Sequence, residues 1–244
     1  MGFKVLITDG LEKEGIDIIN TAGEAVDKKN IEAVELVQIV GEYDGLIVRG
    51  RTKVTKEVFD AARNLKVVGR AGVGVDNIDL EAAKAHSVTV VNAPTATTIA
   101  VAELGFGMML ALVRAIPHTD AAMKQGKWTK KDYMGAELHG KTLGIVGYGN
   151  IGSTIGRYAQ ALGMKVICHD LLRNQDEIRA TGAEPEQLDD IYTQADIITF
   201  HVPLTPETKH MVSDETFTKM KDGVLLVNVA RGGIIEEAAL LRAL

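Results

Sequence analysis

The sequence predicts an α/β protein built from two successive parallel-sheet domains. Short apolar runs of strand length alternate with longer segments of helical period, which is the pattern of parallel strands joined by crossover helices. The alternation is interrupted once, by a turn at Asn92-Ala93-Pro94, and a second series starts at Thr142. A chain of 244 residues suits one large domain or two modest ones. We therefore expect a boundary near residue 95, between domains 1–96 and 97–244.

The first domain is expected to be a small parallel sheet covered by helices. Strands are predicted where short aliphatic runs occur, at Lys4–Ile7, Gly45–Val48, Val67–Gly69 and Val88–Val91. Helices are predicted between them, at Glu12–Thr21, Ile31–Gly41, Lys56–Ala62 and Leu80–His86. Because a helical segment separates successive strands, we expect the strands to run parallel.

The segment Thr98–Ile116 is predicted to be a helix that is apolar on much of its circumference. Glu103 and Arg114 interrupt the apolar stretch, which favours a buried helix over a membrane span. A helix that is apolar all round needs cover on more than one side. We therefore expect the 98–116 region to form the interface of a homodimer. A second amphipathic stretch follows as far as Gly126.

The second domain repeats the alternation of strands and helices. Its predicted strands are Thr142–Val146, Lys165–Cys168, Ile197–Phe200 and Val224–Val227. Its predicted helices are Ile151–Leu162, a segment near Asp176–Thr181, one near Ser213–Met220, and Ile235–Leu244. The fold class is thus α/β, with two Rossmann-like or flavodoxin-like parallel-sheet domains.

Gly147, Gly149 and Gly152 form a dinucleotide-binding fingerprint between a predicted strand and a predicted helix. The first glycine permits a tight turn, the second lets the backbone approach a pyrophosphate, and the third allows close helix packing. The helix, expected to begin at about Asn150, directs free N–H groups and its positive dipole end at phosphates. Asp170, at the end of the next strand, is placed to bind ribose hydroxyls and to repel a 2′-phosphate, which favours NAD over NADP. Alternatively, the glycines only close a turn and Asp170 is a solvated acid.

Arg231 follows the last predicted strand and precedes Gly232-Gly233. Open parallel sheets bind their ligands at the carboxyl ends of the strands, where this side chain is expected to lie. A guanidinium is always charged and holds a carboxylate and a carbonyl in a planar fork. We therefore predict that Arg231 grips a 2-oxo or 2-hydroxy acid. The alternative is a structural salt bridge.

Several motifs together resemble the D-isomer-specific 2-hydroxyacid dehydrogenase family, essentially from end to end. They are Gly147-Tyr148-Gly149-Asn150-Ile151-Gly152, His201-Val202-Pro203-Leu204-Thr205 and Asn228-Val229-Ala230-Arg231-Gly232-Gly233. Three others are most similar to the members that act on 3-phosphoglycerate: Val48-Arg49, the run 69–77, and Gly126-Lys127-Trp128. The resemblance implies a substrate domain followed by a NAD-binding Rossmann domain. It implies NAD-dependent oxidation of 3-phosphoglycerate to 3-phosphohydroxypyruvate, the entry to serine biosynthesis.

The resemblance also implies roles for individual residues. Arg231 matches the catalytic arginine. The substrate is expected to meet Arg49, Arg70, Gly72, Val73, Gly74 and Lys130. The cofactor is expected to meet Val73, Gly147, Gly149, Asn150, Ile151, Gly152, Asp170, His201, Val202, Pro203, Val229, Ala230 and Arg231. His201 matches a residue beside the adenosine half of NAD, so we do not predict it to be the catalytic base. Interdomain salt bridges are an alternative role for Arg49 and Arg70.

Some features depart from the family pattern. Lys130 stands where the 3-phosphoglycerate enzymes often carry an arginine, and Thr97 replaces a common asparagine. The family's acid and base partners of Arg231, a Glu and a His, are expected further along than Leu244. We therefore expect an incomplete NAD-binding domain and a chain that by itself turns over little or nothing. Two other functions remain open: a glyoxylate or hydroxypyruvate reductase, and a non-enzymatic NAD-binding regulator of the same fold.

Composition narrows the classes of partner. The net charge of −6, without a visible basic cluster, argues against nucleic-acid binding. One cysteine, Cys168, allows neither an intrachain disulfide nor a thiolate metal cluster, and is typical of a reducing cytoplasm. The first residues lack the pattern of a secretory signal, and no membrane partner is expected. The expected partners are a small 2-hydroxy or 2-oxo acid and a second copy of the chain, with no metal.

Overall fold

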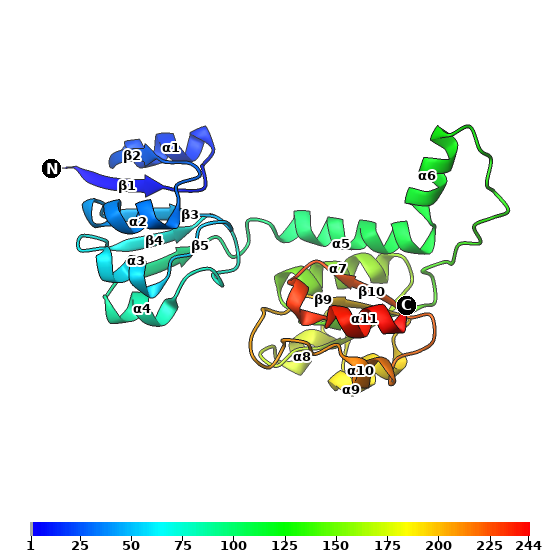
Figure 1. The fold of residues 1–244 in the computed structure, drawn as a ribbon. Coiled ribbons are helices and arrows are strands. Elements are labelled where there is room, and N and C mark those ends of the chain that lie inside the picture. The colour runs from blue at the N-terminus through cyan, green and yellow to red at the C-terminus, as the bar shows by residue number, and fades with distance from the viewer. Residues whose placement is uncertain (1) are drawn as a thin grey trace. The chain divides into compact units, whose positions relative to one another are not determined.

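The computed structural model describes residues 2–244 and divides into two compact units, Met1–Thr97 and Thr98–Leu244. Each unit contains one five-stranded sheet in which every pairing is parallel, with helices on the sheet (Figure 1). The predicted α/β class with two parallel-sheet domains is therefore confirmed. The division falls beside the predicted boundary between residues 96 and 97.

The first unit has the strand order β2-β1-β3-β4-β5, the flavodoxin-like arrangement. Its core packs the aliphatic strand residues against the helices, with Leu6, Leu46 and Phe59 almost wholly buried. The elements are β1 (Phe3–Ile7), α1 (Lys13–Asn20), β2 (Gly23–Asp27), α2 (Ala33–Ile39), a 3-10 turn (Val40–Glu42), β3 (Gly45–Val48), α3 (Lys56–Ala61), β4 (Val67–Arg70), α4 (Leu80–Ala85) and β5 (Thr89–Asn92).

The second unit has the strand order β10-β9-β6-β7-β8, which matches the first five strands of a Rossmann sheet. Two hydrophobic clusters contribute to its core, one including residues of α5 and α7 and the other residues of α9. The elements are α5 (Thr98–Val113), α6 (Ile116–Lys124), β6 (Thr142–Val146), α7 (Asn150–Ala161), β7 (Lys165–His169), α8 (Gln175–Arg179), β8 (Glu184–Pro185), α9 (Leu188–Gln194), β9 (Ile197–Phe200), α10 (Asp214–Phe217), β10 (Leu225–Asn228), a 3-10 turn (Gly232–Ile234) and α11 (Glu237–Ala243).

The predicted helix over 98–116 is α5, which ends three residues earlier, at Val113, and the predicted second stretch up to Gly126 is α6, which begins at Ile116. Ala115 between them has left-handed backbone angles (φ 50°, ψ 36°), which end an α-helix. Pro117 follows in the first turn of α6, a position that proline favours. No single helix among the described residues is long and apolar enough to cross a bilayer; α5 and α6 pass that test only as a pair, bent by 68°.

Three elements were not predicted from the sequence: β2, β8 and α9. The strand β2 has the sequence Gly-Glu-Ala-Val-Asp and contains no buried residue, and β8 is two residues long. The helix α9 buries only Ile191 and Tyr192. Both strands lie at sheet edges, where one side of the strand stays unpaired and a continuous apolar run is not required.

Both units anchor the amino ends of their strands with an aspartate that directly precedes a central strand. In the first unit the Asp44 carboxylate accepts a hydrogen bond of 3.0 Å from the Lys4 amide. In the second, the Asp196 carboxylate accepts one of 2.8 Å from the Thr142 amide. These contacts satisfy amide donors at the start of β1 and β6. They lie at the end of each sheet opposite to the carboxyl ends of the strands.

Candidate functional site

The carboxyl ends of four strands in the second unit lie level with one another. Val146 pairs with His169 on one side and with Phe200 on the other, and Phe200 pairs with Asn228. The loops after β6, β7, β9 and β10 therefore start at the same edge of the sheet. This edge carries the predicted cofactor residues of the unit: Gly147, Gly149, Asn150, Ile151, Gly152, Asp170, His201, Val202, Pro203, Val229, Ala230 and Arg231.

Two of the three fingerprint glycines are required by the packing of the protein itself. Gly147 has φ +92°, and a Cβ there would lie 2.7 Å from the His201 carbonyl oxygen. A Cβ at Gly152 would overlap the carbonyl oxygen of Gly147, because α7 packs closely against the end of β6. Gly149 differs, since it has φ −74° and a Cβ there would meet nothing within 4 Å.

The open space at Gly149 fits a bound dinucleotide. Gly149 caps α7, a helix of 12 residues whose first amides and positive dipole end suit a pyrophosphate. Neither internal packing nor backbone conformation explains a glycine here. Close approach of a ligand to the backbone does explain it. Gly149, Asn150 and Ile151 are thus the residues that would hold the phosphates of NAD.

Asp170 is fixed against the glycine turn by backbone amides. One carboxylate oxygen accepts a hydrogen bond of 2.7 Å from the Tyr148 amide, and the other accepts from the amides of Leu172 (2.8 Å) and Arg173 (2.9 Å). A carboxylate has about four acceptor positions, so one remains for a ribose hydroxyl. The arrangement holds a negative charge beside the turn and disfavours a 2′-phosphate.

Tyr148 and Arg173, neither of which was predicted as a site residue, support this position of Asp170. The Arg173 guanidinium donates a hydrogen bond of 2.8 Å to the Tyr148 carbonyl oxygen and lies over the Tyr148 ring. The Tyr148 side chain is buried, and its hydroxyl is 2.8 Å from the Thr181 hydroxyl. Tyr148 lies inside the glycine motif, so its position was visible in the sequence. The contact between Tyr148 and Arg173 depends on how the loop after β7 folds, so it could not be predicted from the sequence.

His201 follows β9, and burial lowers the pKa of its imidazole to about 4. Its Nε2 lies 2.9 Å from the Thr199 hydroxyl, and its amide donates to the Val146 carbonyl oxygen. A histidine with this pKa is neutral near pH 7 and is a weak proton acceptor. The structure therefore supports a packing role for His201 at the cofactor edge rather than that of a catalytic base.

We expect His201 to reduce stability in acid. The unfolded chain takes up a proton near the ordinary histidine pKa of about 6.5, whereas the folded chain does so only near 4, so stability is lost as pH falls between these values. The loss amounts to about 3 kcal/mol by about pH 4. The free energy of unfolding can be measured with urea for the unaltered chain and for His201→Gln. As the pH falls to about 4, the unaltered chain should lose about 3 kcal/mol relative to the variant. A difference in unfolding free energy that stays constant from about pH 7 to about pH 4 would contradict the lowered pKa of His201.

Arg231 lies in a turn that an asparagine side chain closes. The Asn228 side chain donates to the Arg231 carbonyl oxygen at 2.7 Å and accepts from the Ala230 amide at 3.0 Å. The Arg231 guanidinium donates to the Ala230 carbonyl oxygen at 2.9 Å. Val229 and Ala230 are partly buried and pack against the two hydrophobic clusters. Asn228 belongs to the motif around Arg231, and its side chain closes this turn.

The first unit carries a second group of predicted residues at the carboxyl ends of its strands. Val48 pairs with Arg70, and Arg70 pairs with Asn92, so Arg49 and Ala71 leave the same edge of the sheet. Gly72 has φ +155°, and a Cβ there would overlap the Arg70 guanidinium. The buried Arg70 Nε has no hydrogen-bond partner among the described residues. The backbone conformation at position 72 therefore favours glycine, and a side chain there would displace the Arg70 guanidinium.

The loop 72–74 is held by the end of β5. The Asn92 side chain donates to the Val73 carbonyl oxygen at 2.6 Å, and the Ala93 amide donates to the Gly72 carbonyl oxygen at 3.0 Å. Arg49, Arg70, Gly72, Val73 and Gly74 thus belong to the first unit. Lys130 belongs to the second unit, in the exposed segment between α6 and β6. Among residues 2–244, no group of three or more His, Cys, Asp or Glu side chains is arranged to hold a metal ion.

Comparison with known proteins identifies the second unit. Residues 106–244 match the D-isomer specific 2-hydroxyacid dehydrogenase, NAD binding domain. The chain is 47% identical over 242 residues to D-3-phosphoglycerate dehydrogenase 2, chloroplastic, of Arabidopsis thaliana, covering 99% of the chain and 39% of that protein. It is 46% identical over 242 residues to the D-3-phosphoglycerate dehydrogenase of Homo sapiens, covering 99% and 45%. The chain thus spans less than half the length of these relatives.

Solved structures of other proteins show the same fold. One is a D-lactate dehydrogenase from Aquifex aeolicus complexed with NAD and lactic acid, with a TM-score of 0.88 and 31% identity over 98% of this chain and 72% of that one. Another is a glyoxylate reductase from Paecilomyes thermophila, with a TM-score of 0.91 and 27% identity over 99% and 77%. The predicted cofactor, NAD, is confirmed by the matched domain and by the NAD complex. The chain belongs to the D-isomer specific 2-hydroxyacid dehydrogenase family and carries that family's NAD-binding domain.

Proposed function

We propose that the protein is an NAD-dependent dehydrogenase that oxidises 3-phosphoglycerate at its 2-hydroxyl group, the first step towards serine. The observation that carries the proposal is the placement of Arg231 at the same sheet edge as the glycine turn and Asp170. The names of the relatives, D-3-phosphoglycerate dehydrogenases at 43% to 47% identity, support the choice of substrate. The chain would supply the cofactor site and the arginine of the reaction.

The residues of the chain bind and orient the reactants. NAD supplies the hydride acceptor when it is bound. Arg231 would hold the substrate carboxylate and the oxygen on C2 in its planar fork, which fixes the C2 hydrogen in position for transfer. The same cation stabilises negative charge on the oxygen as its proton passes to the histidine base that the family resemblance implies. Asn228, which closes the turn before Arg231, keeps the backbone of the arginine in place.

A phosphorylated substrate fits the positive charges assigned to the substrate site. Arg49, Arg70 and Lys130 are the cations that the family resemblance places there, and the substrate carries both a carboxylate and a phosphate. Lys130 would act as a point charge, because an ammonium lacks the fork geometry of a guanidinium. Arg49 and Arg70 would bind with directional hydrogen bonds.

Steady-state kinetics of the complete gene product tests this proposal and separates it from the reductase alternative. We expect NAD reduction with 3-phosphoglycerate at a kcat/KM at least about tenfold above that with glycerate, because a phosphate gains charge-assisted hydrogen bonds. A glyoxylate or hydroxypyruvate reductase would prefer the unphosphorylated acids. Binding of NAD without turnover of any of these acids would indicate a regulator of the same fold.

We also propose that a second copy of the chain covers the outer surface of α5 and α6. Helix α5 buries one stripe against α7 and β10, yet Leu104, Met108 and Leu112 on its other side are 58%, 40% and 49% exposed. Helix α6 contains no buried residue, and it extends away from the sheet of its unit (Figure 1). An apolar surface of this kind is typical of a subunit interface.

Sedimentation of the unaltered chain and of Leu104→Glu tests the dimer. We expect a dimer mass for the first and a monomer mass for the second at micromolar concentration, because a buried, unpaired carboxylate opposes association. Leu172→Glu is the matched control, since Leu172 is 98% exposed in the loop after β7 and should leave the dimer intact. A monomer mass for the unaltered chain would refute this interface.

A further inference from the structure

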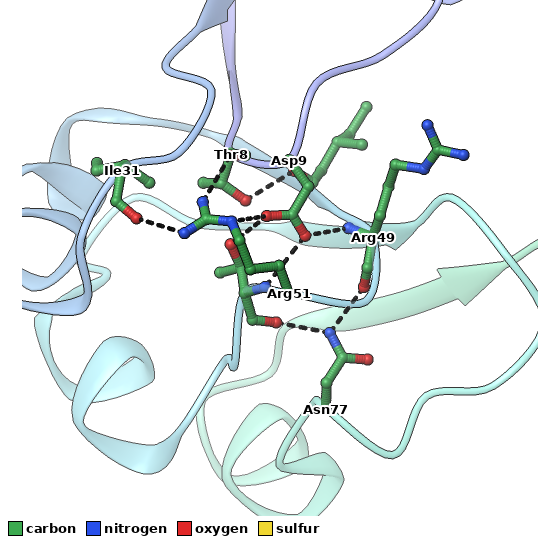
Figure 2. A network of polar contacts seen from close by, with 8 residues as sticks. Thr8, Asp9, Ile31, Arg49, Arg51 and Asn77 are labelled. Atoms are coloured by element: carbon green, nitrogen blue, oxygen red, sulfur yellow. Dashed lines mark hydrogen bonds and ion pairs between the residues drawn. The ribbon is translucent and has the colours of Figure 1, made fainter. Parts of the chain in front are cut away.

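In the first sheet, side chains of the protein itself occupy the place where sheets of this kind bind ligands. In a sheet with this strand order, ligands bind where the order reverses, outside the carboxyl ends of β1 and β3. Here Asp9 follows β1, Arg51 follows β3, and the two side chains meet at that place (Figure 2). Asp9 and Arg51 form the centre of a polar network that no motif of the sequence pointed to.

The Asp9 carboxylate holds the loop 49–52 through four contacts. Its oxygens accept hydrogen bonds from the amide of Arg49 (2.7 Å) and from the amide (3.1 Å) and hydroxyl (2.6 Å) of Thr52. The side chain is only 4% exposed, and its fourth contact is Arg51 Nε at 3.3 Å. A buried carboxylate that receives this many donors is a rigid anchor, because a loss of any contact leaves charge unsatisfied.

Arg51 fastens the same loop to the rest of the edge. Its guanidinium donates to the carbonyl oxygen of Thr8 at 3.0 Å and to that of Ile31 at 3.2 Å. These carbonyl groups belong to the loops that follow β1 and β2. The loop after β3 is therefore tied to both neighbouring loops by one planar side chain (Figure 2).

Asn77 holds the loop from the other side. Its side-chain amide donates to the carbonyl oxygens of Arg49 (2.9 Å) and Thr52 (2.7 Å). Both backbone polar groups of Arg49 are thus bound by side chains, the amide by Asp9 and the carbonyl by Asn77 (Figure 2). The Arg49 side chain contrasts with its backbone: it is 52% exposed, and Glu12, 86% exposed, is 3.9 Å away.

We propose that Asp9 and Asn77 are positioning residues that fix the backbone of Arg49, so that its guanidinium is presented to an anionic group of the substrate. The inference rests on the proposed function, which places Arg49 in the substrate site. A long side chain loses conformational freedom when it binds a ligand, and a fixed backbone reduces the part that remains to be ordered. The network would therefore act on substrate affinity only through Arg49.

A double-mutant cycle in the complete gene product tests this coupling. The measured quantities are the dissociation constant of 3-phosphoglycerate by calorimetry, the KM values for this acid and for NAD, and the thermal midpoint. Arg49→Ala should weaken binding of the acid by about tenfold or more, the range of a lost charge-assisted hydrogen bond. Asp9→Asn and Asn77→Ala should each weaken it several-fold and leave the KM for NAD unchanged. Asp9→Asn should add nothing in the Arg49→Ala background.

Asp44→Asn is the matched control for stability. It removes a similar contact between a carboxylate and a backbone amide in the same sheet, at the amino ends of the strands. We expect it to lower the thermal midpoint without changing either KM. If Asp9→Asn weakens binding of 3-phosphoglycerate by the same factor in the unaltered protein and in the Arg49→Ala background, the positioning role is overturned. The proposed function would then remain intact. The protein could instead show the expected coupling between Asp9 and Arg49 in the binding of 3-phosphoglycerate but fail to reduce NAD. That result would support the positioning role and refute the proposed function.

Discussion

Replacing Arg231 with glutamine is expected to lower kcat/KM for the hydroxy acid by about a thousandfold in the complete gene product. Glutamine removes the charge and the paired donors that hold the carboxylate and the C2 oxygen. A thousandfold loss corresponds to about 4 kcal/mol of transition-state stabilisation, the upper range for one preorganised donor group. Steady-state kinetics with saturating NAD measures it.

Arg231→Lys separates charge from geometry. Lysine keeps the charge but cannot form the planar fork, so we expect it to recover no more than about tenfold of the loss. The affinity for NAD should change less than about threefold in both variants, because the glycine turn and Asp170 remain. A glutamine variant that keeps its kcat/KM, or that loses NAD affinity by the same factor as kcat/KM, would remove Arg231 from the catalytic role.

Gly152→Ala and Gly149→Ala are expected to separate folding from cofactor binding. A Cβ at Gly152 would overlap the Gly147 carbonyl oxygen and lie 3.1 Å from Ile145 Cγ2, so α7 must shift away from β6. We expect a loss of about 1–3 kcal/mol in stability and a fall of at least about a hundredfold in NAD affinity. Gly149→Ala adds a methyl group in open space and should lower stability by no more than about 1 kcal/mol, the range for an unfavourable N-cap residue.

The methyl group at position 149 should act mainly on the binding of the ligand. It occupies the space in which the pyrophosphate is expected to approach the backbone, so the NAD dissociation constant should rise about tenfold or more. Calorimetric titration with NAD and thermal unfolding measure the two effects separately. If Gly149→Ala binds NAD as tightly as the unaltered chain, the pyrophosphate does not lie against this glycine.

The sequence predicted the cofactor edge because its signals are local. The glycine spacing, the strand before it and the helix after it fall within one short segment, and Asp170 ends the next strand. The parallel order then brings these strand ends to one edge without further information. The break after α5 was also predicted locally, after Ile116, and the structure places it slightly earlier, at the left-handed Ala115.

The network around Asp9 was beyond prediction for a physical reason. Asp9 lies 40 positions from Arg49 and 43 from Thr52, and Asn77 lies 28 positions from Arg49. Nothing in the local sequence of any of these residues sets their distance, which follows only from the arrangement of three loops. The edge strands β2 and β8 were not predicted because partial exposure leaves them without a continuous apolar run.

Calorimetric titration of the chain with NAD and with NADP tests the central claim most directly. The claim is that the glycine turn and Asp170 together form a site for the unphosphorylated dinucleotide. The 2′-phosphate of NADP would meet the fixed Asp170 carboxylate, so we predict that NAD binds at least about tenfold more tightly. Equal or tighter binding of NADP would contradict the account of this site.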